Sequence, residues 1–176
     1  LIFPGILIIF YPVVFSIQND KDTRMLEIVF GVPNYRYKVY MVRFAITILL
    51  LFFILVLMSG FAYFAVVQIP IFRMVFELMY PLTFLACISF LLSTLIKNGN
   101  GAAVVVVIIG LIFWFLGAVL ENSKWNIFLN PFAIPDEMNI TIWADVISKN
   151  RLILMVGAMV SILWGLINLQ SREKFV

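Results

Sequence analysis

The sequence predicts an all-α membrane protein, a polytopic helical bundle in which five transmembrane helices are visible. The charged residues, 12 Lys and Arg with 9 Asp and Glu, leave five long runs without any charge. A helix needs about 20 apolar residues to cross roughly 30 Å of hydrocarbon, so each run is long enough to span a bilayer. Hydrophobic residues make up 64% of the chain, whereas soluble domains are about 45 to 50% apolar. The runs cover residues 1–19, 44–72, 78–96, 98–120 and 152–171.

These runs predict a single transmembrane domain over residues 1–176, without room for a sizeable soluble domain. Only a few residues around Pro70 separate the second and third spans, which predicts an antiparallel hairpin. The apolar run begins at Leu1, so we expect further residues upstream and a first span cut at its outer end. The expected spans are residues 1–17, 44–69, 74–96, 101–120 and 152–169.

The residue types argue against an enzyme acting by itself. The chain has no histidine, the commonest general base and metal ligand. Cys87 lies inside an apolar run, where a small buried hydrophobe is far commoner than a reactive thiol. Gly99-Asn100-Gly101 lacks the spacing and the lysine of a phosphate-binding loop. We therefore expect no cofactor on this chain.

Lysine and arginine predict the orientation, because they accumulate in cytoplasmic loops. Eight lie on the side that holds the segment after the first span, the connection at Lys97 and the C-terminus. The other side holds four, namely Arg73, Lys124, Lys149 and Arg151. We therefore expect a multi-pass protein of the cell inner (plasma) membrane with a cytoplasmic C-terminus.

The cytoplasmic segment 19–43 is longer than a hairpin requires and contains an amphipathic pattern. Over residues 23–30 the apolar side chains recur at helical spacing, and Gly31 and Pro33 can end such a helix. The helix is expected to lie flat at the inner surface. Periodicity leaves open whether it rests on lipid headgroups or docks on another protein.

The outer segment 121–150 is too polar to span the membrane and too apolar to extend into water. Pro131 and Pro135 interrupt it, and Trp143 and its apolar neighbours give it hydrophobic surface. We expect a re-entrant segment with one or two short helices that dip into the outer leaflet and pack on the bundle.

Glu77 is the one charge within an expected span. A carboxylate at the membrane centre costs about 2.5 to 3.5 kcal/mol, so it needs a partner or water. Arg73 lies one helical turn earlier and can supply that partner. The sequence leaves open whether Arg73 and Glu77 form a local intramembrane pair or Glu77 faces a translocation path.

The order of these features resembles the permease of ABC-2 type transporters, a family of bacterial exporter subunits. The local similarity lies in Asp22-Thr23-Arg24-Met25-Leu26-Glu27, then Val32-Pro33 and Arg36. Asn34-Tyr35 departs from the family's usual Val-Ser, and Arg43 stands where the family often has Lys. Residues 92–98 and 129–132 resemble two further parts of the family.

The resemblance implies a six-helix permease whose first helix is missing from this sequence. Residues 23–30 would be the coupling helix that docks on a separate ABC ATPase, which holds ATP and Mg. A second permease, identical or paralogous, would complete the path, and membrane lipid would surround the pair; no nucleic acid is expected. The implied ATPase-coupling residues are Thr23, Arg24, Leu26, Glu27 and Arg36.

Two other classes stay open on the sequence. A secondary transporter or channel needs buried ionisable groups or broken helices near the midplane, and Glu77 is the only hint of them. A membrane anchor that transports nothing demands no particular residue. The sequence does not choose a cargo.

Overall fold

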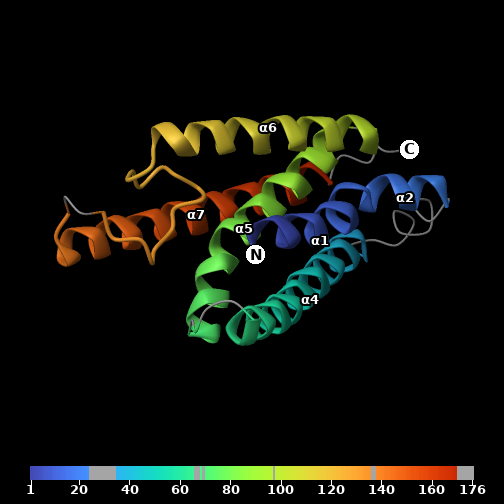
Figure 1. The fold of residues 1–176 in the computed structure, drawn as a ribbon. Helices are drawn as coiled ribbons and strands as arrows, with labels where there is room; N and C mark the ends of the chain where they lie inside the picture. The colour runs from blue at the N-terminus through green and yellow to red at the C-terminus, as the bar shows by residue number, and fades with distance from the viewer. Residues whose placement is uncertain (24–34, 66–67, 69, 97, 136–137, 170–176) are drawn as a thin grey trace.

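The computed structural model describes residues 1–23, 35–65, 68, 70–96, 98–135 and 138–169. These residues form helices and turns (Figure 1). Five stretches are long and apolar enough to cross a membrane, with α1 and α2 counted together as one. The predicted all-α class and its five candidate spans are confirmed, as expected of a multi-pass membrane protein. The helices are α1 (Ile2–Val14), α2 (Ser16–Asp22), α4 (Tyr35–Ala65), α5 (Ile71–Leu95), α6 (Gly99–Val119) and α7 (Ile140–Asn168).

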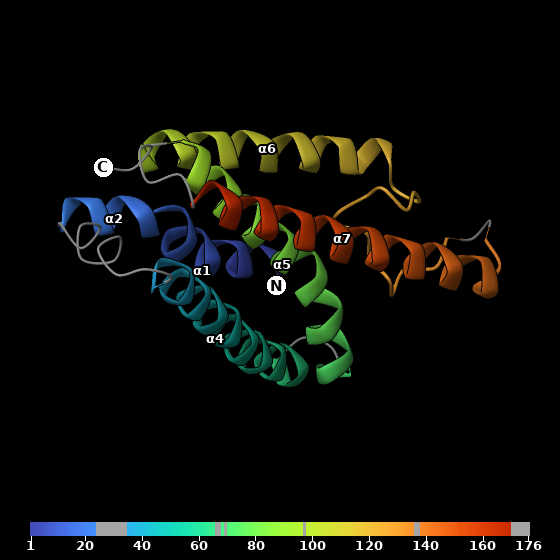
Figure 2. The same cartoon turned by 180° about the vertical axis from the view of Figure 1, so that it is seen from behind.

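Helix α5 is the centre of the bundle and contacts α1, α4, α6 and α7 (Figures 1 and 2). In the most apolar 18-residue stretch of α5, 44% of the residues are buried. The corresponding share in α6, which lies at the periphery, is 6%. The bundle has two ends. We call the end with α2 and the start of α6 the α2 end, and the end with residues 120–135 the turn end.

Helices α5 and α7 run in the same direction and stay in register along the bundle. Glu77 bonds to Arg151 near the turn end, and Thr94 Oγ1 lies 3.5 Å from Asn168 Nδ2 near the α2 end. Both pairs are 74 residues apart in the chain. The two helices therefore keep the same neighbours over about five turns, at about 3.6 residues per turn.

Two glycines allow the close approach of α7 to α5. A Cβ added at Gly157 would lie 2.6 Å from Phe84 Cε2, and one added at Gly165 would lie 2.8 Å from Phe90 Cδ1. Both distances are shorter than any ordinary carbon contact. Small residues are what membrane helices use where their backbones approach, so these positions fix the packing of the pair.

Helices α4 and α5 form the predicted antiparallel hairpin. Phe44 packs on Phe90 near the α2 end, and Phe52 packs on Phe76 toward the turn end. Helix α1 lies against both helices, and the three bury one apolar cluster: Ile9, Leu51, Leu55, Val75, Leu82, Leu85 and Ala86.

The connection between α5 and α6 is tight because Asn98 caps α6. Its Oδ1 accepts a hydrogen bond from Asn100 N at 2.9 Å, which satisfies one of the donors left open at a helix start. Gly99 then packs directly on α1 and α2, where an added Cβ would meet Gln18 and Phe15.

The expectation of separate short helices in the outer segment is wrong for the residues described there. Residues 120–135 form turns, and the chain from Ile140 onward is the beginning of α7. At 29 residues and about 1.5 Å per residue, α7 is longer than the hydrocarbon core is thick. The apolar residues around Trp143 therefore extend the last span instead of forming a helix of their own.

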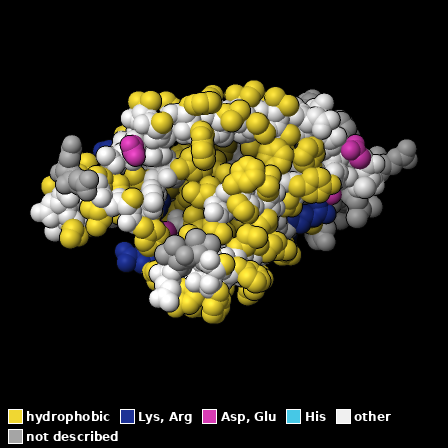
Figure 3. All heavy atoms as spheres, viewed as in Figure 1, with side chains coloured by type: hydrophobic (Ala, Val, Ile, Leu, Met, Phe, Trp, Pro, Cys, Tyr) yellow, Lys and Arg dark blue, Asp and Glu magenta, His cyan; other side chains and the backbone are white. Residues whose placement is uncertain are grey.

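Charge is segregated on the surface. Figure 3 shows hydrophobic side chains over the middle of this face, and the charged ones visible there lie toward its two ends. Such a band is what a bundle with lipid around its middle requires.

Candidate functional site

Two polar clusters lie at opposite ends of the bundle. At the α2 end, Arg43 Nη1 of α4 lies 2.6 Å from Asp20 Oδ2 of α2. Asp20 is only 5% exposed, while the Arg43 side chain is 42% exposed. The carboxylate is therefore held by a specific partner, and the guanidinium still reaches the surface.

This ion pair joins the two sides of the segment that carries the predicted coupling helix. Asp20 precedes residues 24–34 and Arg43 follows them. The guanidinium also lies 5.9 Å from the centre of the Tyr40 ring, a cation–π distance. The pair therefore connects α2 and α4 directly.

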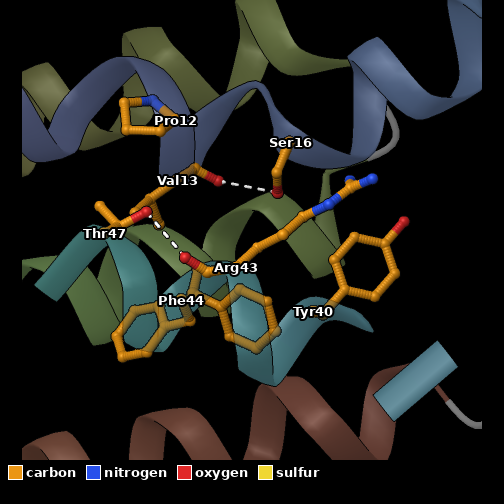
Figure 4. A pocket seen from close by; sticks show the side chains of 8 residues that line it. Pro12, Val13, Ser16, Tyr40, Arg43, Phe44 and Thr47 are labelled. Carbon is orange, nitrogen blue, oxygen red and sulfur yellow. Dashed lines mark hydrogen bonds between the residues drawn. The ribbon is translucent and has the colours of Figure 1, made fainter. Parts of the chain in front are cut away.

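The space beside the pair is too small to hold a substrate. Figure 4 shows the cavity between α1 and α4, with Pro12 and Val13 on one side and Phe44 and Thr47 on the other. Its volume is about 10 Å³, enough for about one water molecule. The described space beside the pair is therefore filled by packed side chains and is not a ligand pocket.

Of the five predicted coupling residues, Thr23 is the one whose side chain the structure describes. It follows α2 directly, and its Oγ1 donates a hydrogen bond to Asn19 O at 2.7 Å. Arg24, Leu26 and Glu27 lie outside the described residues, as does the predicted helix that they would form. Arg36 lies in the first turn of α4.

At the turn end, the carboxylate of Glu77 bonds to Arg151 and not to Arg73. Arg151 Nε donates to Glu77 Oε2 at 2.8 Å, and both side chains are largely buried, at 9% and 21% exposed. Arg73 is exposed and stacks on Phe132, with its guanidinium 5.6 Å from the ring centre. Along a helix, an ion pair is weaker when the base precedes the acid by four residues, as Arg73 precedes Glu77. Glu77 therefore pairs with Arg151 of α7.

Arg151 and Asn150 carry this cluster from α7 into the turns. Arg151 Nη1 donates to Asn150 Oδ1 at 3.0 Å. Asn150 Nδ2 in turn donates to the carbonyls of Lys124 and Asn126, each at 2.8 Å. Buried polar groups need such partners, so this chain of bonds docks the turns onto α7.

Arg151 and Asn150 were not expected as members of a site, although the sequence contains a signal for Arg151. Glu77 and Arg151 each stand immediately before a charge-free run, 78–96 and 152–171. The two corresponding spans are expected to cross in the same direction. Opposite charges at the same depth of two such helices are candidates for a pair.

A cleft opens beside this cluster, between the first half of α5 and the middle of α7. It measures about 670 Å³, within the range of about 300 to 1,000 Å³ typical of ligand pockets. Arg73, Glu77, Tyr80 and Arg151 line its polar part. Its apolar part is formed by Leu152, Met155, Val156 and Met159.

Neither cluster has the composition of a metal centre. Among the described residues, no three His, Cys, Asp or Glu side chains gather in one place.

No family model, no curated protein and no solved structure matches this chain.

Proposed function

We propose that this chain is a membrane-spanning permease subunit of an ATP-driven exporter, of the kind that the ABC-2 type resemblance implies. A second permease completes the translocation path, and separate ATPase subunits supply the energy at the α2 end, which faces the cytoplasm. The observation that carries the proposal is the Asp20–Arg43 pair, because it closes the base of the segment with the coupling-helix pattern.

The positions of α1, α2 and α4 suit the transmission of movement from residues 24–34 to the membrane helices. Helix α2 continues α1 after a break at Phe15, and α4 begins on the other side of the segment. Both α1 and α4 pack on α5. A movement at residues 24–34 would therefore reach the central helix from two sides.

The other end of α5 is held to α7 by Glu77 and Arg151. The same two helices are in close contact at Gly157 and Gly165. A tilt of α5 would therefore move α7 with it instead of sliding past it. Rigid coupling of this kind is what alternating access by a helical bundle requires.

Co-purification tests the proposal. The full-length protein, extracted in mild detergent from its native membrane, should bring with it an ATPase that contains a phosphate-binding loop. A Glu27→Ala variant should still insert but should stimulate ATP hydrolysis less, because the contact that passes motion to the membrane is weakened. Glu121→Ala is the matched control, since it removes an exposed carboxylate from the opposite end.

The buried Glu77–Arg151 pair is the observation that favours a second candidate, a secondary transporter. That candidate predicts ion-gradient-dependent uptake or release by the purified chain in vesicles without any ATPase. Recovery of the chain without an ATPase, together with such gradient-driven transport, would overturn the exporter proposal.

A further inference from the structure

The cleft at the turn end combines a cation at its mouth with an apolar wall. Arg73, in the first turn of α5, is exposed and borders the cleft. Its guanidinium is positioned over Phe132 at 5.6 Å from the ring centre. The aromatic ring restrains the arginine, so less entropy is lost when an anion binds to it.

The other charges that line the cleft compensate each other. Arg151 and Glu77 form their own pair at 2.8 Å, so together they add no net charge. Among the described lining residues the net charge is therefore that of Arg73, one positive charge. An anionic group is the complement of this mouth.

The apolar wall has the length and direction of a hydrocarbon chain. Its residues, spaced three and four apart, form one stripe along α7, and each is about half exposed or more: Leu152, Met155, Val156 and Met159. The stripe rises about 10 Å along the helix, at about 1.5 Å per residue. One leaflet of the hydrocarbon core is about 15 Å deep, so the stripe covers most of it.

Methionine suits this wall. Met155 and Met159 have unbranched, polarizable side chains, which adapt to an irregular apolar partner. The cation at the mouth and the stripe below it follow the order of a lipid, with the headgroup at the surface and the acyl chain beneath it. A rigid soluble anion would bind the cation at the mouth and leave the apolar stripe uncovered.

We infer that this cleft binds an anionic membrane lipid, with its phosphate headgroup at Arg73 and one acyl chain along the α7 stripe. The inference does not depend on whether the chain couples to an ATPase. It places the bound lipid in the leaflet at the turn end, which is the outer leaflet if the charge distribution gives the correct orientation.

Native mass spectrometry of the full chain released from nanodiscs tests this. The nanodiscs contain equal amounts of phosphatidylglycerol, which is anionic, and phosphatidylcholine, which is zwitterionic. Wild type should retain phosphatidylglycerol preferentially. Arg73→Gln should reduce that preference about fivefold, the effect of roughly one cation near a lipid headgroup.

Lys124→Gln is the matched control. Lys124 is an exposed cation at the same end that stacks on Trp125 and does not line the cleft. Its loss should leave the preference unchanged. Equal losses in both variants would mean that general surface charge selects the lipid, and the inference would be wrong.

A cleft-filling variant tests the apolar half. Met155→Trp should displace the retained lipid although Arg73 is intact, and inorganic phosphate added in millimolar amounts should not displace it. Displacement by phosphate alone would identify a soluble-anion site. Loss of a dimer in Met155→Trp, with no lipid retained by wild type, would identify an interface between two copies. Either result would overturn the inference.

In each variant, slow labelling of buried Cys87 checks that the bundle is folded.

Discussion

Arg151 Nε and Glu77 Oε2 lie 2.8 Å apart across two helices that run in the same direction. The pair closes the α5–α7 interface at the turn end, and the glycine contacts continue that interface toward the α2 end. Because Asn150 extends it to the turns through two carbonyls, a single buried cluster positions two helices and a connecting segment.

Loss of one member of this pair should destabilise the bundle strongly. Glu77→Ala would leave Arg151 largely buried without its counter-charge, and breaking a buried pair costs about 3 kcal/mol or more. The measurement is the rate at which a fluorogenic maleimide labels Cys87, which is buried and reacts when the helices open. Glu77→Ala should raise this rate about a hundredfold or more, since each 1.4 kcal/mol is about a factor of ten.

Asp145 supplies the control for that variant. It pairs with Lys149 at 2.6 Å, but both side chains are more than half exposed. An exposed pair contributes less than about 1 kcal/mol, so Asp145→Ala should scarcely change Cys87 labelling. Similar effects of the two variants would contradict the structural role assigned to Glu77 and Arg151.

How far the sequence predicts this fold depends on the kind of information each element needs. The five candidate spans follow from charge-free runs because burying a charge in the centre of the hydrocarbon core is costly. The start of α7 does not follow, because residues 140–151 contain Asp145, Lys149, Asn150 and Arg151. Asp145 and Lys149 are exposed, whereas Asn150 and Arg151 are buried by partners from other segments.

The partner of Glu77 shows the same limit. Spacing along one helix identifies Arg73 as a neighbour, whereas Arg151 becomes a neighbour only once α5 and α7 are known to be adjacent. The ATPase-coupling assignment of Thr23, Arg24, Leu26, Glu27 and Arg36 stays a prediction. Most of that segment lies outside the described residues.

Gly157 and Gly165 of α7 should tolerate substitution far less than Gly110 of α6, where an added Cβ has no neighbour within 4 Å. Gly165→Ala would put a methyl group 2.8 Å from Cδ1 and 2.9 Å from Cε1 of the buried Phe90 ring, which would have to shift to make room. Overpacking of this kind costs about 1 to 3 kcal/mol, and the midpoint of thermal unfolding in detergent should fall by several degrees.

Gly110→Ala on α6 is the matched substitution. An added Cβ there has no neighbour within 4 Å, and alanine is the better helix former by roughly 1 kcal/mol in water. The unfolding midpoint should stay the same or rise. If the unfolding midpoint fell more in Gly110→Ala than in Gly165→Ala, the α5–α7 contact would not limit stability.

The predicted orientation can be tested with single added cysteines. Asn122 and Asn100 are exposed at the turn end and the α2 end, and the native Cys87 is buried, so background labelling is low. An impermeant maleimide should label Asn122→Cys in intact cells and Asn100→Cys only after permeabilisation. The reverse pattern would place the predicted coupling segment outside the cell.

The Asp20–Arg43 pair should matter more for coupling than for stability. Since the Arg43 side chain is 42% exposed, water can replace part of what Asp20→Asn removes, and Cys87 labelling should change by less than about fivefold. The link between the two sides of residues 24–34 is lost, however. A complex assembled with this variant should hydrolyse ATP with several-fold weaker stimulation by the membrane subunit. The charge exchange Asp20→Arg with Arg43→Asp should recover part of that stimulation, because it restores the bridge with its polarity reversed. If the complex with Asp20→Asn kept full stimulation of ATP hydrolysis, the Asp20–Arg43 pair would not be needed to couple the ATPase to the membrane helices.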